Sequence, residues 1–189
     1  MRPLPPVTQS GAPRLALHLR AGGTPLLEPS AETTAGYDES VTDRAQSVHY
    51  TMAVASGMTR EHMLDDQRFA SRRPDVLTYQ TDELTGDVTL AGPIWPSLQV
   101  STSGTDSDFV VKVIDVYPAD YPDPPPIGAA GAAAAGGYSR MGGYQQMVRG
   151  EVFRGKFRNS FEKPEPFQPN TMAKIDYVMP DVFHTFRRG

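Results

Sequence analysis

Residues 101–118 read STSGTDSDFVVKVIDVYP and join a polar connection to an apolar strand. The second half is apolar and β-rich, and in a β-strand its successive side chains would point to opposite faces. The two faces hold alternate residues: Val111, Val113 and Asp115 on one, and Val110, Lys112, Ile114 and Val116 on the other. We predict that Val110, Ile114 and Val116 belong to the hydrophobic core. Lys112 then needs a partner or a route to solvent.

The polar half of this stretch combines hydroxyl and carboxylate side chains, which are the ligands that calcium prefers. The candidate ligands are Ser103, Thr105, Asp106 and Asp108. Their spacing does not match the D-x-[DN]-x-[DN]-G loop of an EF-hand. Short polar side chains also close hairpins by bonding to their own backbone. We therefore predict a tight turn here and no metal site.

The composition indicates one domain with many turns. The chain has 189 residues, 39% of them hydrophobic, with 18 prolines and 17 glycines. A chain of this length buries about 70% of its unfolded surface when it forms one domain. Frequent proline and glycine favour short strands over long helices. We predict an all-β architecture in a single domain over residues 1–189.

Charge and cysteine content limit the kinds of partner and of site. The net charge is -4, with acidic and basic residues interspersed, and there is no cysteine. This charge pattern argues against nucleic acid or an anionic membrane as a partner. No apolar run approaches the roughly 20 residues of a membrane helix, and the opening residues lack the apolar core of a signal peptide. We expect no membrane segment or export signal in this chain, and its compartment is left open.

Alternating or β-rich runs predict a series of short strands. An early strand at 14–20 places Leu15, Leu17 and Leu19 on one face, directs His18 to solvent and ends in a turn at Gly22. Another short strand is considered at 47–53. The remaining predicted strands cover 76–81, 88–92, 98–102, 109–116, 144–153 and 173–178. Strands at spacings of about 8 to 12 residues are typical of a sandwich or barrel.

Residues 118–143 differ from the rest because they are rich in proline and then in glycine and alanine. Such a segment has few large apolar groups to offset the entropy of ordering. We predict a mobile loop at about 118–143. A short helix over the alanines is the alternative, opposed by the glycines that flank them.

No residue pattern specifies an enzyme site. The segment closest to a G-x-S-x-G nucleophile elbow surrounds Ser139 and lacks the second glycine. The four histidines are far apart and show no metal-ligand spacing: His18, His49, His62 and His184. The sequence therefore assigns no catalytic, cofactor-binding or metal-ligating residue and implies no cofactor.

A run of mixed charge and one tryptophan also allow more than one interpretation. The run comprises Arg149, Glu151, Arg154, Lys156, Arg158, Glu162, Lys163 and Glu165. It is interpreted as a solvated face or a domain interface held by ion pairs. Trp95 would stack on a sugar in a carbohydrate-binding sandwich, but a core or inter-domain position is more common for tryptophan.

Several ordered motifs resemble one family of serine hydrolases. They are DQRF at 66–69, RPDVLTY at 73–79, LAGP at 90–93 and the stretch at 101–118. Together they resemble the C-terminal domain of the family that includes Xaa-Pro dipeptidyl-peptidase, bacterial cocaine esterase and the glutaryl-cephalosporin acylases. MGGYQQMVRGEVFRGKFR at 141–158 and FEKP at 161–164 look most like α-amino-acid ester hydrolases. The resemblance extends from about residue 15 to residue 189.

The resemblance implies a jelly-roll β-sandwich of the galactose-binding-like type, which agrees with the strand spacing. In the family this sandwich follows an α/β-hydrolase domain and a helical cap, which carry the Ser-His-Asp triad. None of those motifs is present here, so no catalytic residue is transferred and no α/β-hydrolase domain is expected in this chain. Family members continue beyond the position of Gly189, so the sandwich is expected to lack its last strands.

The leading hypothesis is a non-catalytic β-sandwich portion of such a serine hydrolase, inactive by itself. Its expected partner is the α/β-hydrolase catalytic domain, and contacts between copies of the chain are left open. The alternative is an independent carbohydrate-binding or adhesive sandwich. A third interpretation is a truncated gene product without activity.

Overall fold

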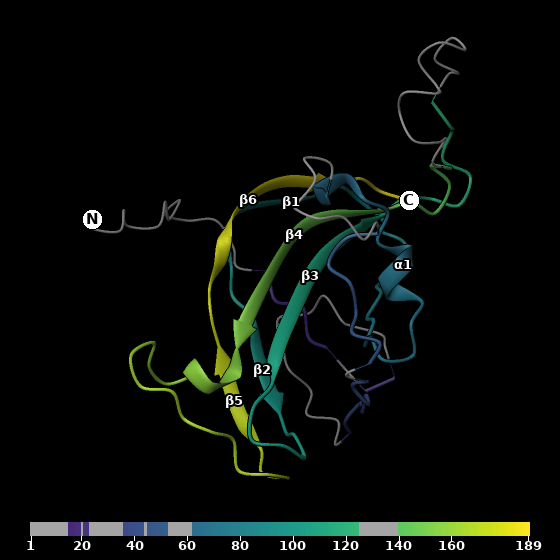
Figure 1. Ribbon diagram of the computed structural model, residues 1–189. Helices are drawn as coiled ribbons and strands as arrows, with labels where there is room; N and C mark the ends of the chain where they lie inside the picture. Colours follow the sequence, from purple (N-terminus) through teal and green to yellow (C-terminus); the bar gives the residue numbers. More distant parts are fainter. Residues whose placement is uncertain (1–14, 20, 23–35, 44, 53–61, 125–139) are drawn as a thin grey trace. The chain divides into compact units, whose positions relative to one another are not determined.

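The computed structural model (Figure 1) describes residues 15–19, 21–22, 36–43, 45–52, 62–124 and 140–189. They divide into two compact units. Unit 1 contains residues 89–114 and 148–185, and unit 2 contains the described residues up to 88, together with 115–147 and 186–189. The assignment of residues 1–189 to one domain stays a prediction.

Strands dominate the regular structure of the described residues. They are β1 (Val88–Ile94), β2 (Ser97–Val100), β3 (Asp108–Val116), β4 (Gln145–Arg154), β5 (Ala173–Asp176) and β6 (Met179–Phe186). The helical elements are single turns: η1 (His62–Leu64), α1 (Arg68–Ser71) and η2 (Gly155–Phe157). The all-β class is therefore confirmed. None of the helices in the described ranges has the length and hydropathy to cross a bilayer.

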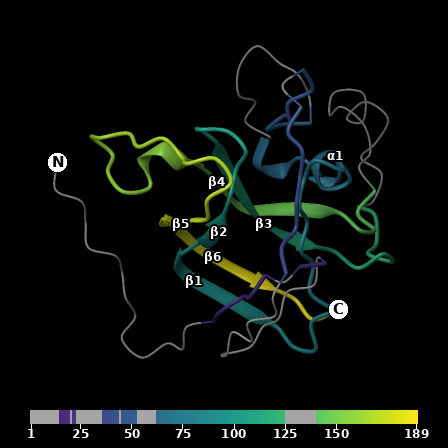
Figure 2. The ribbon, with the colours of Figure 1, turned by 90° about the horizontal axis from the view of Figure 1, so that it is seen from below.

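Four of the strands form one interrupted antiparallel ribbon. β1 pairs with β6, and β2 pairs with β5 in a register that sets Leu98 opposite Ile175. Figure 2 shows β1 beside β6. Two residues separate β1 from β2 and two separate β5 from β6, and Tyr177 N donates to Pro96 O at 3.2 Å across this break. The ladder breaks here because Pro96 has no N–H to donate.

β3 and β4 form the remaining pair. Gly155 N donates to Ser107 O and Tyr117 N to Tyr144 O, each at 2.9 Å, so the strands run antiparallel. The register at Ser107 places Val110 opposite Val152, and these side chains are 52% and 46% exposed. The prediction that Val110 belongs to the core is therefore wrong.

The core of unit 1 lies on the other face of β3 and β4. Its buried residues are Phe153, Phe167, Ile175, Tyr177 and Met179. Val111 and Phe109 of β3 pack against them, so the core takes the odd-numbered face of that strand. The rings of Phe153 and Tyr177 stack with centroids 4.9 Å apart, and Phe109 meets Phe167 edge-on at 6.2 Å. Ile114 and Val116, which were also predicted to belong to the core, are half-buried and lie outside this core cluster, as does Lys112.

The N-terminal predictions hold less well. Residues 15–19 contain a single bridge residue, His18, in place of a strand. Leu15, Leu17 and Leu19 are 53%, 50% and 48% exposed, whereas His18 is half-buried with its Nε2 enclosed. The solvent-facing assignment of His18 is therefore wrong, because the leucines take the outer side. The turn is confirmed at Gly22, whose N–H donates to Asp38 Oδ1 at 3.0 Å.

Two further strand predictions are wrong and one strand was not anticipated. Residues 47–52 and 76–81 are irregular. In the second segment the polar side chains bond within unit 2, since Thr78 Oγ1 donates to Ser71 O at 3.1 Å and Tyr79 to Asp38 at 2.9 Å. β6 was not predicted because Pro180 and Asp181 interrupt its apolar pattern.

The segment at 118–143 is described only at its ends. Gly143 N donates to Pro118 O at 3.0 Å, and Met141 N donates to Asp123 Oδ1 at 2.8 Å. These bonds hold the start and the end of the segment together. Residues 125–139 lie outside the described residues, so the mobile loop stays a prediction.

Candidate functional site

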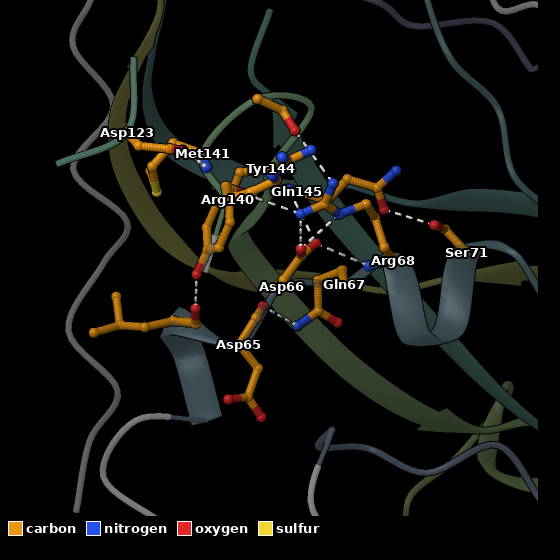
Figure 3. Close-up of polar contacts among 12 residues, drawn as sticks. Asp65, Asp66, Gln67, Arg68, Ser71, Asp123, Arg140, Met141, Tyr144 and Gln145 are labelled. Atoms are coloured by element: carbon orange, nitrogen blue, oxygen red, sulfur yellow. Dashed lines mark hydrogen bonds and ion pairs between the residues drawn. The ribbon is translucent and has the colours of Figure 1, made fainter. Parts of the chain in front are cut away.

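A polar cluster of unit 2 is centred on Arg68, at the start of α1 (Figure 3). Its guanidinium forms an ion pair with Asp66, and Arg68 Nε donates to Asp66 Oδ2 at 2.5 Å. The same guanidinium donates to the carbonyls of Gly142 and Arg140, at 3.2 and 3.1 Å. This hydrogen bonding to Asp66 raises the pKa of Arg68 above its ordinary value, so the guanidinium stays charged.

Neighbouring groups tie the same two stretches of chain together. Gln67, which is fully buried, donates its backbone N–H to Gln145 O at 3.0 Å and its Nε2 to Asp65 O at 2.8 Å. The Tyr144 hydroxyl donates to Leu64 O, and burial, reinforced by Asp66 and Asp65, raises the pKa of this phenol. Figure 3 shows the contact between Gln67 and Asp65 and that of the Tyr144 hydroxyl beside the Asp66–Arg68 pair.

The cluster contains one serine in position to be tested as a nucleophile. Ser71 Oγ donates to Gln145 Oε1 at 2.6 Å (Figure 3). An amide oxygen cannot take up the proton as an imidazole does, so this hydroxyl is not activated. The chemistry of the Arg68 cluster is therefore that of a structural joint between residues 64–72 and 140–145.

Two of the candidate calcium ligands, Asp106 and Asp108, lie beside cations of the protein. Lys156 Nζ lies 3.0 Å from Asp106 Oδ2, and Arg154 Nε lies 3.6 Å from Asp108 Oδ2. The Thr102 hydroxyl accepts from Gly104 N at 3.1 Å, as in a polar turn. Residues 103–105 form a bend, and β2 and β3 on either side of it belong to different strand pairs, so this polar connection does not close a hairpin. The contacts also explain part of the mixed-charge run as surface ion pairs.

The remaining singled-out residues do not gather into a site. His49 is exposed, His184 is half-buried in β6, and the side chain of His62 is not described. In the described part of the chain, no three histidine, aspartate or glutamate side chains form a metal-ligating group. Trp95 is 50% exposed, so it is not a core residue, and its inter-domain position stays a prediction. Ser139 lies outside the described residues.

The contacts within both units are thus structural, and the comparisons with known proteins agree with that character. The family model described as the X-Pro dipeptidyl-peptidase C-terminal non-catalytic domain matches residues 14–189. The chain belongs to this family. The resemblance drawn from DQRF, RPDVLTY and the later motifs is therefore confirmed.

Two solved structures are similar to most of this chain. An aminopeptidase from a marine sediment archaeon, Thaumarchaeota archaeon, is 34% identical with a TM-score of 0.76. An α-amino acid ester hydrolase is 37% identical with a TM-score of 0.73. Both matches cover 92% of this chain, but only 27% and 26% of those proteins. The non-catalytic domain is thus a part of larger enzymes in these relatives.

A curated relative supports the same family over a shorter stretch. Cocaine esterase from Rhodococcus sp. (strain MB1 Bresler) is 45% identical over 53 residues, which are 28% of this chain and 9% of the esterase. The chain therefore spans about a quarter or less of the proteins that it matches. These matches favour the non-catalytic domain of a hydrolase over an independent carbohydrate-binding or adhesive sandwich.

The Arg68 cluster was missed as a site from sequence. Two of its segments, DQRF and MGGYQ, supported the family resemblance, but neither suggested a contact between them. Arg68 is separated from its carbonyl partners by 72 and 74 residues. No local pattern predicts which guanidinium meets which carbonyl over such a distance.

Proposed function

We propose that this chain is the non-catalytic portion of a serine hydrolase that cleaves ester or peptide bonds of α-amino acyl substrates. In the complete protein it packs on an α/β-hydrolase domain and forms one wall of the substrate entrance. The catalytic serine, its base and the groups that bind the substrate's ammonium belong to that domain. By itself the chain does not catalyse hydrolysis.

The observation that carries this proposal is the unequal coverage of the matches. The family is described as non-catalytic, and 92% of the chain corresponds to about a quarter of two larger enzymes. One of these enzymes is an aminopeptidase and the other an α-amino acid ester hydrolase, which supports the proposed substrate class. Both reactions proceed at a carbonyl next to an amino-bearing carbon, which a serine nucleophile attacks to form an acyl-enzyme.

The first experiment measures hydrolysis by the purified 189-residue chain. The substrate is a nitrophenyl ester of an α-amino acid, and the complete α-amino acid ester hydrolase is the positive control. We expect no release of nitrophenol above the buffer rate. Any turnover by the chain would contradict a non-catalytic role, whether or not Ser71→Ala abolishes it.

The second experiment measures the expected partner. The catalytic portion of the α-amino acid ester hydrolase, without the quarter that matches this chain, is co-expressed with the tagged chain. We expect the two to co-purify in a one-to-one complex. Sedimentation of the chain alone tests association between its copies. Failure to bind the catalytic portion would remove the proposed role.

A further inference from the structure

The segment from Gly155 to Phe167 lacks strands but is held by many internal hydrogen bonds. Arg158 Nη1 donates to the carbonyls of Gly155 and Glu165, at 3.1 and 2.8 Å, and its Nη2 donates to Pro166 O at 3.2 Å. The Arg158 guanidinium also lies 4.4 Å from the centre of the buried Phe167 ring. One side chain therefore fixes both ends of this loop to the core of unit 1.

Further bonds close the interior of the loop. Glu165 N donates to Lys156 O at 2.7 Å, and Asn159 Nδ2 donates to Glu165 Oε2 at 2.6 Å. Ser160 Oγ accepts from the N–H groups of Glu162 and Lys163, each at 3.2 Å. The loop, which we call the braced loop (residues 155–167), is thus held at its base, its middle and its tip.

The tip of the braced loop presents an aromatic ring to solvent. Phe161 is 82% exposed, and its ring meets Phe153 only at its edge, with centroids 6.4 Å apart. Its neighbours Glu162, Lys163 and Pro164 are also exposed. An aromatic ring beside charges of both signs is the composition of an interface anchor with a polar rim.

The rigidity of the braced loop lowers the entropic cost of binding a partner. A flexible loop loses conformational entropy when a partner immobilises it, and this loss weakens binding. The hydrogen bonds of Arg158 and Ser160 order the braced loop before any partner arrives. An aromatic anchor on a preordered loop therefore retains more of the free energy of its burial.

We propose that Phe161 is the anchor by which the braced loop docks on the catalytic portion of the hydrolase. This inference rests on the proposed function, since it names the surface that the non-catalytic domain uses. The occupant is the catalytic portion because the chain spans only about a quarter of its solved relatives, so most of such a protein lies outside it. The partner surface would hold an apolar pocket bordered by charges that pair with Glu162 and Lys163.

The test measures, by titration calorimetry, the affinity of the chain for the catalytic portion purified separately. Three forms are compared: the wild type, Phe161→Ser and Phe183→Ser. Phe183, in β6, is the matched control because it is 85% exposed and carries the same side chain. We expect Phe161→Ser to raise Kd at least tenfold and Phe183→Ser to leave it within about twofold. Circular dichroism of all three forms checks that folding is unchanged.

The outcomes separate the two proposals. If the wild type and Phe161→Ser bind the catalytic portion with equal affinity, Phe161 is not the anchor, and the proposed function is unaffected. If only Phe183→Ser loses affinity, the inference is also wrong, because the contact then lies on β6. Self-association of the chain that disappears with Phe161→Ser, without any effect on the catalytic portion, assigns the loop to a second copy and overturns the inference. Absence of any wild-type binding contradicts the proposed function itself.

Discussion

Arg68 shows how one side chain can hold two distant stretches of sequence. Its guanidinium lies between Asp66 and the carbonyls of Gly142 and Arg140. The side chains of Arg68 and Asp66 are 25% and 14% exposed, so water competes only weakly for these bonds. Hydrogen bonds to charged groups under such conditions contribute about 1.5–3 kcal/mol each.

Replacement of Arg68 by methionine is therefore expected to lower the free energy of unfolding of unit 2 by about 2 kcal/mol. The measurement is amide hydrogen exchange in residues 62–72 and 140–146. The control is Arg187→Met, which removes an ion pair to Asp87 whose side chains are 81% and 43% exposed. Such exposed pairs contribute little. Equal effects of the two substitutions would contradict a role of Arg68 as the joint.

Tyr177 offers a prediction of opposite sign. Its hydroxyl is buried and finds no hydrogen-bond partner in the described structure, while its ring stacks on Phe153. Tyr177→Phe keeps the stacking and removes the unsatisfied hydroxyl, so we expect unit 1 to gain up to about 1 kcal/mol of stability. The comparison is Tyr79→Phe, which loses a 2.9 Å hydrogen bond to Asp38 and should destabilise unit 2. Urea denaturation measures both changes.

Alkaline pH should destabilise both units. Burial, followed by hydrogen bonding to Asp38, raises the pKa of Tyr79 to about 12, and burial, followed by Glu151, raises that of Tyr177 to about 12. Unfolded tyrosine titrates at about 10, so the fold favours the neutral phenol. This stabilisation is fully present below about pH 10 and is lost as pH rises through about 12. We expect the urea midpoint to fall across that window, and less so in Tyr177→Phe. An unchanged midpoint would rule the linkage out.

Some residue-level assignments could not be made from sequence alone. Both faces of residues 109–116 carry valines, so alternation separates the two faces without selecting the buried one. The partner strand selects it, because Phe153 faces the core while Val152, opposite Val110, faces outward. His18 is a similar case, since the leucines beside it are the more exposed residues.

At the scale of elements, Gly155 sets the approach of η2 to the core. A Cβ at this position would lie 2.5 Å from ring carbons of Phe167 and 2.8 Å from Ser107 O. Gly155→Ala is therefore expected to cost about 1–3 kcal/mol, because the buried ring or the backbone must shift. Gly86→Ala is the matched control, since nothing lies within 4 Å of its Cβ. Thermal denaturation compares them, and similar melting temperatures would refute the close packing.

The strands that sequence predicted well are those with an apolar alternation and clear turn residues at both ends. The run at 109–116 becomes β3 and the run at 144–153 becomes β4, with bounds that differ by one residue. Residues 76–81 have the same composition of strand formers, but their side chains bond to other loops, and no strand pairs with them in the described structure. β-propensity therefore located strands only where a neighbour was available to complete the ladder.

At the scale of the whole molecule, docking on the catalytic portion should stabilise the chain. A partner that binds only the folded state raises the free energy of unfolding, by about 2.7 kcal/mol at a free concentration of 100 times Kd. We expect the melting temperature of this chain to rise as the catalytic portion is added. Phe161→Ser should require a higher concentration for the same rise. A melting temperature independent of the partner would contradict docking on the folded chain.

The hydrogen bonds that join Tyr117 to Tyr144 and Pro118 to Gly143 have a consequence for evolution and engineering. The two described ends of the intervening segment meet in the folded chain, so extra residues between them need not separate these ends. Doubling the length of a closed loop costs only about 0.6 kcal/mol. We therefore expect an epitope tag inserted between Asp123 and Arg140 to leave the protein folded, which circular dichroism would check.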